Sequence, residues 1–369
     1  QKDNDDILSV YRFILENCAD KETFSKKSAS ILDMINKNVL SDADEKKWIV
    51  YADNVFASIL VVWIYEQAVD IWKKEVKISD EEFLKLLRYF IEGNYSEEIF
   101  ALGQYACAQL KAVTDPKLCY DLTKKAFTVY PQLAKHLNVS YCYQGEAAIE
   151  HLTEECPFCG STGSDLVPHF CFPQVLKIKN NHTFPPAKLW MKCSRCQNYF
   201  TYNFPLPDVG EINGHYTKDK NGSVVCNRFS LAIYNHIFDR LKKMTEGKDY
   251  LEVGIGNGEM LAVAQEFGYD VDAVEICRED CERVSSVLGV DIKWCDFVNY
   301  QTDKKYDVII MGDVFEHVTK PMAVLKKVRE LLKDEGVLWL STPNYNCAYA
   351  RMEKFSHCMW QELNHYTYV

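Results

Sequence analysis

The chain is 369 residues long, and its 53 acidic residues outnumber its 42 lysines and arginines, which gives a formal net charge of −11. This excess of negative charge argues against a nucleic-acid-binding surface spread over the whole molecule. The longest apolar run, residues 55–65, is too short to cross a bilayer, so we expect no membrane span.

Residues 1–145 are predicted to be an all-α region. Segments 80–90 and 119–127 repeat apolar side chains at helical spacing, and Asp115-Pro116 is a suitable helix start. We expect a bundle of roughly six helices. Paired helices of this size resemble tetratricopeptide units, although no period repeats cleanly. No catalytic constellation is visible in this region, which favours docking to a protein partner or self-association.

Residues 146–205 contain two C-x-x-C pairs: Cys156, Cys159, Cys193 and Cys196. Four thiolates at this spacing are typical of a tetrahedral zinc site, which predicts a small zinc ribbon. A site closed by four thiolates has no open coordination position, so the Zn²⁺ is expected to be structural. The alternatives are a redox or disulfide pair and a chance spacing. The intervening His169 and Cys171 could replace one of the four ligands or take no part in the site.

The remaining cysteines are scattered singly along a chain with fifteen in all. Such a distribution is typical of buried, reduced thiols, and no secretory pattern opens the chain. We therefore expect a cytoplasmic protein. Residues 206–224 are rich in proline, glycine and polar side chains, which predicts a linker or a lid.

A short apolar strand beginning at Tyr250 leads into a turn with glycines at Gly254, Gly256 and Gly258. Glycines at this point let the backbone approach a nucleoside-like ligand closely. The dinucleotide fingerprint G-x-G-x-x-G is not matched, which disfavours a pyrophosphate ligand. The acidic Glu252 would repel a pyrophosphate, whereas it would attract the ammonium and sulfonium groups of S-adenosylmethionine, directly or through water.

Two further strands end in acidic residues. Glu275 closes the strand at 270–275 and is our candidate for accepting hydrogen bonds from ribose hydroxyls. Asp296 follows the apolar stretch that starts at Val290, where it is suited to accept from an adenine amino group beside the ring of Phe297. Three acids in or after successive strands favour one common ligand.

From residue 225 to Val369 the sequence resembles a class I S-adenosylmethionine-dependent methyltransferase. The first motif, E-x-G-x-G-x-G, is intact, and segments 306–321 and 336–344 are similar to the fourth strand and to the fifth strand with its loop. The resemblance implies an α/β, Rossmann-like domain over 225–369, in which Asp313 contacts the cofactor. A class I sheet normally ends with a sixth strand and an antiparallel seventh, and no residues remain for them. We therefore favour a truncated domain whose C-terminal strands are missing, and the alternative is that another element covers this edge of the sheet.

The helix after the fourth strand is amphipathic. Its predicted inward side chains are Met322, Leu325, Val328, Leu331 and Leu332.

The Glu316-His317 pair is similar to the family branch that contains quinone-precursor O-methyltransferases and sugar or small-molecule methyltransferases. His317 is the candidate general base, because an imidazole can take a proton from a nucleophile at neutral pH. Some relatives instead use this loop to hold a divalent cation, for which Asp313, Glu316 and His317 are the candidate ligands. The third interpretation is structural: Glu316 caps a turn and His317 lines the pocket wall.

His365 resembles a pocket histidine that related sugar and quinone methyltransferases place after the fifth strand, and it is a second catalytic candidate. Sugar C-methyltransferases carry Glu before this histidine, whereas this chain has Asn364. That difference argues against a carbanion mechanism. A purely structural histidine is the alternative.

Together these features predict methyl transfer from S-adenosylmethionine to a small or carrier-bound acceptor, with an oxygen of a sugar, glycan or phenolic group as the favoured nucleophile. Two other functions stay open. One is an RNA or protein methyltransferase whose ribbon binds the macromolecule, although the net acidity disfavours nucleic acid. The other is a non-catalytic scaffold with a relic fold, against which the acids in register argue.

Overall fold

The computed structural model describes five stretches of the chain: residues 97–130, 150–173, 185–205, 228–362 and 364–369. It also describes Glu81, Phe83, Leu84, Leu87, Arg88 and Leu133 individually. Most of the predicted helical region and the whole predicted linker at 206–224 lie outside the described residues. Among the described residues, no helix has both the length and the apolar character needed to cross a membrane.

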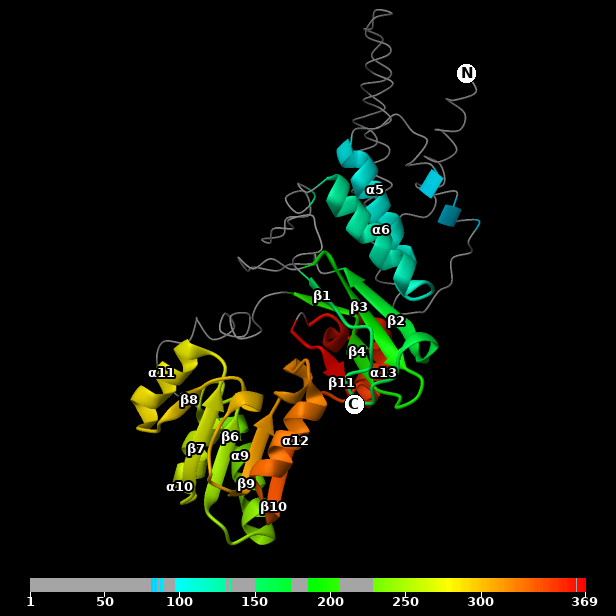
Figure 1. Cartoon of the computed structure of the whole chain (residues 1–369). Helices are drawn as coiled ribbons and strands as arrows, with labels where there is room; N and C mark the ends of the chain where they lie inside the picture. Colours follow the sequence, from blue (N-terminus) through cyan, green and yellow to red (C-terminus); the bar gives the residue numbers. More distant parts are fainter. Residues whose placement is uncertain are drawn as a thin grey trace, which may run out of the picture.

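Two helices, α5 (Glu97–Leu110) and α6 (Pro116–Val129), pack side by side at one end of the molecule (Figure 1). The predicted start of α6 is confirmed. Asp115 accepts a hydrogen bond from the N–H of Leu118 at 3.1 Å, and Pro116 occupies the first turn, where its missing N–H costs nothing. Helix α6 then buries one face, along which Tyr120 and Phe127 are spaced for a helix.

An antiparallel sheet, which we call the ribbon sheet, follows α6 and packs against it. It comprises β2 (Leu166–Pro173), β3 (Ala187–Cys193), β4 (Tyr199–Thr201) and β11 (Thr367–Tyr368), in the order β11-β4-β3-β2. A separate pair joins β1 (Glu150–Leu152) to β5 (Asn203–Pro205), and a short 3-10 turn, η2, covers Gly163–Asp165.

The ribbon sheet takes its edge strand from the far end of the chain. After the last strand of the parallel sheet described below, the chain forms α13 (Ala348–Glu353) and the turns η5 (Lys354–Ser356) and η6 (Cys358–Trp360). Strand β11 then pairs with β4, Thr367 opposite Phe200 and Tyr368 opposite Tyr199. In Figure 1 this red segment lies against the green ribbon sheet. We call residues 344–362 and 364–369 the C-terminal segment.

A second sheet is wholly parallel and has five strands in the described residues. The strands are β6 (Asp249–Val253), β7 (Asp270–Glu275), β8 (Ile292–Trp294), β9 (Tyr306–Gly312) and β10 (Leu332–Ser341). Their order, β10-β9-β6-β7-β8, confirms the expected Rossmann-like sheet. Because the chain moves outward from β6 to β8 and then crosses back to β9, the order reverses between β6 and β9. Ligands bind at such a reversal in open α/β sheets.

Helices cover both faces of the parallel sheet. Tyr250 contributes to a core with α9 (Arg228–Met244), α10 (Glu259–Glu266) and α11 (Arg278–Leu288), whereas the next residue, Leu251, contributes to the core on the opposite face. That opposite core contains α12 (Pro321–Leu331), which follows the 3-10 turn η4 (Phe315–His317), and the turn η3 (Phe297–Asn299). This alternation follows from the two-residue period of a strand.

The predicted inward face of α12 is partly wrong. Val328 and Leu331 are buried as expected, but Met322 is 48% exposed, and Val324 is buried in its place. The helix begins at Pro321, and the 3.6-residue period that joins Val324 to Val328 and Leu331 turns position 322 toward solvent. Leu325 and Leu332 pack, partly buried, against the same core as predicted, although Leu332 already belongs to β10.

Candidate active site

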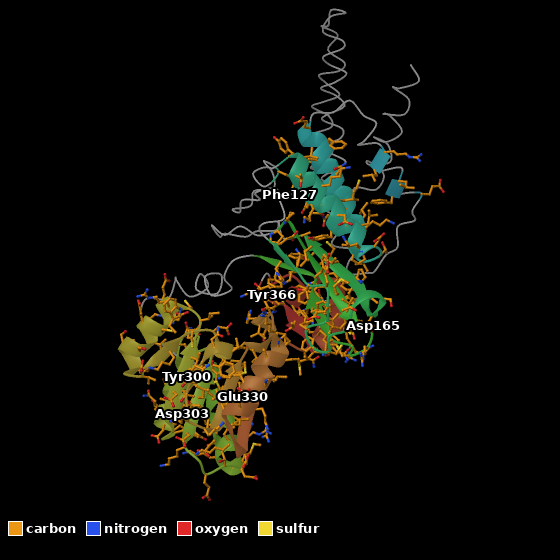
Figure 2. All side chains as sticks on the ribbon, in the orientation of Figure 1. Phe127, Asp165, Tyr300, Asp303, Glu330 and Tyr366 are labelled. Atoms are coloured by element: carbon orange, nitrogen blue, oxygen red, sulfur yellow. The ribbon has the colours of Figure 1, made fainter. Side chains whose placement is uncertain are left out.

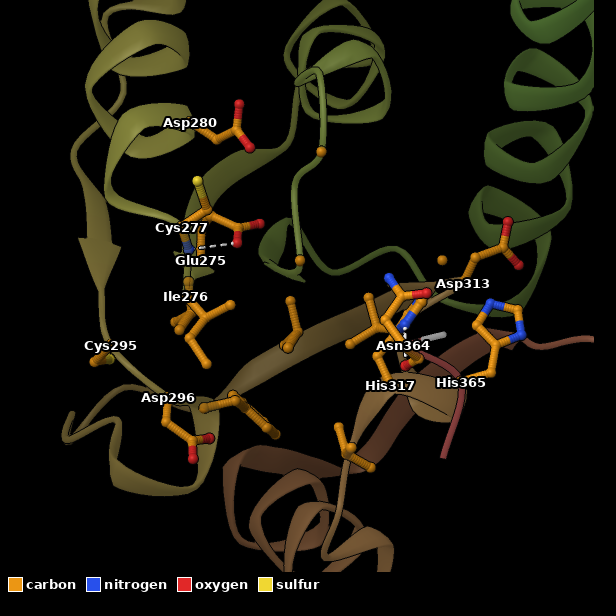
Figure 3. A pocket seen from close by; sticks show the side chains of 18 of the residues that line it. Glu275, Ile276, Cys277, Asp280, Cys295, Asp296, Asp313, His317, Asn364 and His365 are labelled. Carbon is orange, nitrogen blue, oxygen red and sulfur yellow. Dashed lines mark hydrogen bonds between the residues drawn. The ribbon is translucent and has the colours of Figure 1, made fainter. Parts of the chain in front are cut away.

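A cavity of about 420 Å³ lies at the carboxyl ends of the parallel strands, at the point where the strand order reverses (Figure 3). Its lining includes these candidates from the sequence: Gly254, Gly256, Glu275, Asp296, Phe297, Asp313, His317 and His365. Glu252, Gly258 and Glu316 lie outside the lining. Figure 3 separates Glu275 and Asp296 on one side of the cavity from Asp313, His317 and His365 on the other.

The three glycines of the turn differ in what surrounds them. All three have positive φ, between +49° and +78°. A Cβ on Gly254 would lie 2.4 Å from Val314, and one on Gly258 would lie 2.5 Å from Val284, so these two glycines allow close packing of the turn. A Cβ on Gly256 would meet nothing within 4 Å. Gly256 lines the cavity, so its missing side chain leaves room for a ligand.

Glu252 is only 3% exposed and does not line the cavity. Its Oε2 accepts a hydrogen bond from the hydroxyl of Tyr250 at 2.6 Å. Burial raises the pKa of Glu252 to about 8, a shift that the Tyr250 hydrogen bond opposes and the charge of Glu275 reinforces. A carboxyl that is largely protonated at pH 7 offers little charge to a cationic ligand, so a direct contact from Glu252 to a sulfonium has no support in this geometry.

Glu275 ends β7 and is held from both sides. One carboxylate oxygen accepts from the N–H of Ile255 at 2.9 Å, and the other accepts from the N–H of Cys277 at 2.8 Å. The pKa of Glu275 is raised by burial, while these two backbone donors lower it. Each oxygen keeps a lone pair for a further donor, so the side chain fits the expected ribose contact.

Asp296 and Phe297 follow the end of β8 after one intervening residue, Cys295. Asp296 is exposed and accepts from the N–H of Val298 at 3.1 Å, which starts the 3-10 turn η3, while Phe297 is buried at the cavity wall. A free carboxylate oxygen beside an aromatic wall suits an adenine-like ring. The glycine turn, Glu275 and this pair together fit the nucleoside half of S-adenosylmethionine.

On the other side of the cavity, Glu316 and His317 lie in the turn η4 after β9. Glu316 is 1% exposed, and its Oε2 accepts from the hydroxyl of Thr342 at 3.1 Å. Burial, reinforced by the charge of Asp313, raises the pKa of Glu316 to about 7. The pKa of His317 is lowered, chiefly by burial, which favours the neutral imidazole.

The tautomers of both histidines follow from their partners. His317 Nδ1 lies 2.8 Å from the carbonyl oxygen of Asn364, which can only accept, so Nδ1 carries the proton. His365 Nδ1 lies 2.7 Å from the hydroxyl oxygen of Tyr368. Because that hydroxyl donates its own proton to the carbonyl of Met359, it can only accept from His365, so Nδ1 of His365 also carries the proton. Both imidazoles therefore keep the Nε2 lone pair as an acceptor. The two rings meet edge to face, with centroids 4.7 Å apart.

Glu316, His317 and His365 each bring one possible ligand atom within 4.8 Å of the others. This set differs from the expected cation site, because it contains His365 in place of Asp313. The backbone of Asp313 has φ +52°, and its Oδ1 accepts from the hydroxyl of Ser341 at 2.7 Å, so its carboxylate is held toward β10.

The four cysteines of the two C-x-x-C pairs also meet in space, with their sulfur atoms all within 4.8 Å of one another. Cys156 and Cys196 lie 3.5 Å apart, and Cys159 and Cys193 lie 3.6 Å apart. His169 and Cys171 are absent from the cluster. His169 is surrounded by Tyr199, Phe355 and Trp360, and its pKa is lowered by burial to about 4.

Sequence reasoning missed several residues at the site. Arg283 donates to the carbonyl of Gly256 at 2.9 Å and to Asp280 at 2.6 Å, so it fastens the glycine turn to α11. Asp280, Cys277, Glu362 and Asn364 line the cavity. A charged residue inside the helix after β7 was a weak signal for Arg283. The resemblance had already indicated that His365 lines the pocket, whereas no local pattern pointed to Glu362 or to the backbone of Asn364.

Comparison with known proteins places this site in a family. A family model described as a methyltransferase domain matches residues 228–369. The ubiquinone biosynthesis O-methyltransferase of Actinobacillus pleuropneumoniae serotype 7 (strain AP76) is 32% identical over 109 residues, which are 27% of this chain and 47% of that protein. The (S)-coclaurine N-methyltransferase of Thalictrum flavum subsp. glaucum is 24% identical over 153 residues, 38% of this chain and 42% of that protein.

Among solved structures, a coclaurine N-methyltransferase bound to N-methylheliamine and SAH is similar over 30% of this chain and 34% of that chain, at 26% identity and a TM-score of 0.27. The chain spans about half the length of the curated O-methyltransferase relatives that it matches. The matched family model, the O-methyltransferase relatives, the strand order and the glycine turn together identify residues 228–369 as a domain of the class I S-adenosylmethionine-dependent methyltransferase family.

Proposed function

We propose that the protein is an S-adenosylmethionine-dependent methyltransferase that acts on a small or carrier-bound acceptor, with an oxygen of a sugar, glycan or phenolic group as the nucleophile. The observation that carries this proposal is the position of His317: it lines the same cavity as Glu275 and Asp296, and its Nε2 is left free to accept a proton. The relatives include both O- and N-methyltransferases, so an amine acceptor is the nearest alternative.

In this proposal, residues on one side of the cavity bind the cofactor and residues on the other side take the proton of the acceptor. Glu275 would hold the ribose hydroxyls, Asp296 and Phe297 the adenine, and Gly256 gives the cofactor its room. Bound S-adenosylmethionine supplies an electrophilic methyl group, which an oxygen or nitrogen nucleophile takes up as S-adenosylhomocysteine leaves. His317 Nε2 accepts the proton of that nucleophile, and its Nδ1–H, held by the Asn364 carbonyl, fixes the ring. Glu316 lies beside the ring to stabilise the imidazolium.

A metal-assisted reaction is the second candidate, and it is supported by the meeting of Glu316, His317 and His365. Histidines that bind metals commonly donate their other ring N–H to a carbonyl or carboxylate, as His317 does to Asn364. One carboxylate and two imidazoles are ligands that suit several divalent transition metals. In this case His317 would be a ligand and not the base.

For the ribbon sheet we propose a structural Zn²⁺ held by Cys156, Cys159, Cys193 and Cys196. The four sulfur atoms form a compact cluster, and Gly160, at φ +69°, closes the turn beside them. Four cysteines that hold zinc must stay reduced, which fits the proposed cytoplasmic location.

The test begins with binding. Calorimetry of the full chain with S-adenosylmethionine and S-adenosylhomocysteine should give a dissociation constant in the micromolar range. A panel of phenols, sugars and small amines is then incubated with methyl-labelled cofactor, with and without chelator. Chelator-resistant transfer favours the base, and chelator-sensitive transfer restored by a divalent ion favours the metal. A folded protein that binds neither cofactor form would refute the enzyme and leave the scaffold, while transfer only to RNA or protein would favour the macromolecular alternative.

A further inference from the structure

Lys188 is a buried lysine of the ribbon sheet, 1% exposed, on β3. Its Nζ donates to the backbone carbonyl of Glu362 at 2.5 Å and to that of His365. The same Nζ lies 4.7 Å from the ring centre of Trp190 and 5.7 Å from that of Tyr366. Burial holds the pKa of Lys188 well below its usual value. A buried lysine nitrogen is costly unless acceptors replace its water, and the two carbonyls supply such acceptors whether the group is an amine or an ammonium.

Glu362, Asn364 and His365 belong to one loop, and contacts made by Trp360 before it and Tyr366 after it fix this loop on two sides. Toward the ribbon sheet, Trp190 Nε1 donates to the carbonyl of Trp360 at 3.0 Å, and the N–H of Thr201 donates to the carbonyl of Tyr366 at 2.9 Å. Toward the parallel domain, the N–H of Tyr366 donates to the carbonyl of Glu316 at 2.6 Å. Figure 2 labels Tyr366 at the junction between the two sheets. The loop is therefore clamped between β3, β4 and the turn η4.

The clamped loop supplies part of the cavity. Glu362, Asn364 and His365 line it, and the carbonyl of Asn364 receives the Nδ1 proton of His317. Lys188 holds the carbonyls on either side of Asn364. A shift of this loop would therefore move His365 itself and would remove the group that fixes the ring of His317.

We propose that Lys188 is a positioning residue of the active site, which fastens the loop carrying Glu362, Asn364 and His365 to the ribbon sheet and thereby orients both histidines. The ribbon sheet is then a structural half of the catalytic pocket and not a tethered binding module. This inference depends on the proposed function only in taking the His317 end of the cavity as the acceptor side.

The test compares two lysines of one strand. Lys188→Met keeps most of the apolar stem and removes the donors. Lys192→Met is the matched control, because Lys192 lies on the same face of β3, with its Nζ 5.4 Å from the ring centre of Tyr199. Each full-length variant is labelled with ¹⁵N-histidine, and the ring signals of the two pocket histidines are assigned from His317→Asn and His365→Asn. Binding of S-adenosylhomocysteine is measured in parallel.

In the wild type and Lys192→Met we expect His317 to show one tautomer, protonated at Nδ1, with a slowly exchanging proton. In Lys188→Met we expect that proton signal to be lost and the tautomers to mix, while the affinity for S-adenosylhomocysteine stays within about twofold, because the nucleoside side is untouched. An unchanged His317 spectrum in folded Lys188→Met would overturn the proposal.

If Lys188→Met does not fold, hydrogen exchange of the wild-type protein tests whether the loop is held in place. The amide protons of Tyr366 and Thr201 should exchange at least about 100-fold more slowly than those of exposed loops, because both are bonded across the junction. Exchange at the rate of exposed loops would mean that the loop is not clamped, and would overturn the proposal. A wild type that fails to bind S-adenosylhomocysteine would refute the proposed function, yet the histidine spectra and exchange rates would still report on Lys188.

Discussion

The Nδ1 of His317 lies 2.8 Å from the backbone carbonyl oxygen of Asn364, although 47 residues separate the two along the chain. This hydrogen bond sets the tautomer of the candidate base. It also joins the turn η4 to the C-terminal segment, which pairs with the ribbon sheet through β11 and is held there by Lys188. The chemistry proposed for the end of the parallel sheet thus depends on a loop that the ribbon sheet holds in place.

His317→Asn should abolish most of the methyl transfer, because asparagine cannot accept the proton of the nucleophile. Loss of a general base typically lowers the rate by about 10²–10⁴-fold. The affinity for S-adenosylhomocysteine should change little, since the residues expected to hold the nucleoside lie across the cavity. Transfer of a labelled methyl group and calorimetry measure the two effects, with the exposed His151→Asn as control. Full activity in His317→Asn would exclude the base assignment.

Gly258→Ala should mainly lower the stability of the protein, whereas Gly256→Ala should mainly weaken cofactor binding. Both place a Cβ at positive φ, which costs about 1–2 kcal/mol. At position 258 the Cβ also meets Val284 at 2.5 Å, so we expect a further loss of stability and a clearly lower melting temperature. At position 256 no neighbour is met, and the new methyl group enters the cavity, so cofactor binding should weaken in a protein that is still folded. Equal effects on melting and binding in both variants would contradict this division.

Stability should depend on pH through Glu252. Its folded pKa is raised to about 8, well above the usual value of about 4.3 in an unfolded chain. The folded state therefore holds the proton more tightly, so the stability that this group contributes is complete below the unfolded pKa and is lost as the pH rises toward 8. Urea unfolding of Glu252→Gln between pH 5 and pH 8 should show a weaker decline, by on the order of a few kcal/mol.

Some decline should remain in Glu252→Gln, because the pKa of Glu316 is also raised, to about 7. Glu266→Gln, an exposed change on α10, is the control and should follow the wild type. An identical decline in Glu252→Gln and the wild type would mean that Glu252 is ionised in the folded protein.

Zinc removal should expose one reactive thiol. Hydrogen bonds from the side chain and the backbone of Ser161 lower the pKa of Cys159 to about 6, so its sulfur is largely thiolate at pH 7. We expect about one zinc ion per chain in the purified protein. With a chelator, iodoacetamide should modify Cys159 faster than the exposed Cys358, and the melting temperature should fall. A metal-free preparation with unchanged melting would refute the structural zinc site.

Local patterns in the sequence predicted much of the side of the cavity that we propose holds the nucleoside. The alternation around Tyr250, the glycines that follow it and the acid at Glu275 specify a strand, a tight turn and a strand end, because each depends on backbone conformation within a few residues. The C-x-x-C spacing likewise brings each pair of thiols together within one turn. The phase of α12 was misjudged only at its start, since the apolar residues Met322 and Val324 lie two positions apart and cannot share one helical face.

The tertiary structure decided what lies on the other side of the cavity. The sequence named Glu316, His317 and His365 as candidates, but that their ligand atoms meet within 4.8 Å depends on the return of the C-terminal segment to the ribbon sheet. The contacts of Lys188 with the carbonyls of Glu362 and His365 have no periodic signature, because they join residues more than 170 positions apart. Propensity and spacing act over a few residues, whereas these contacts exist only once two separate sheets have packed together.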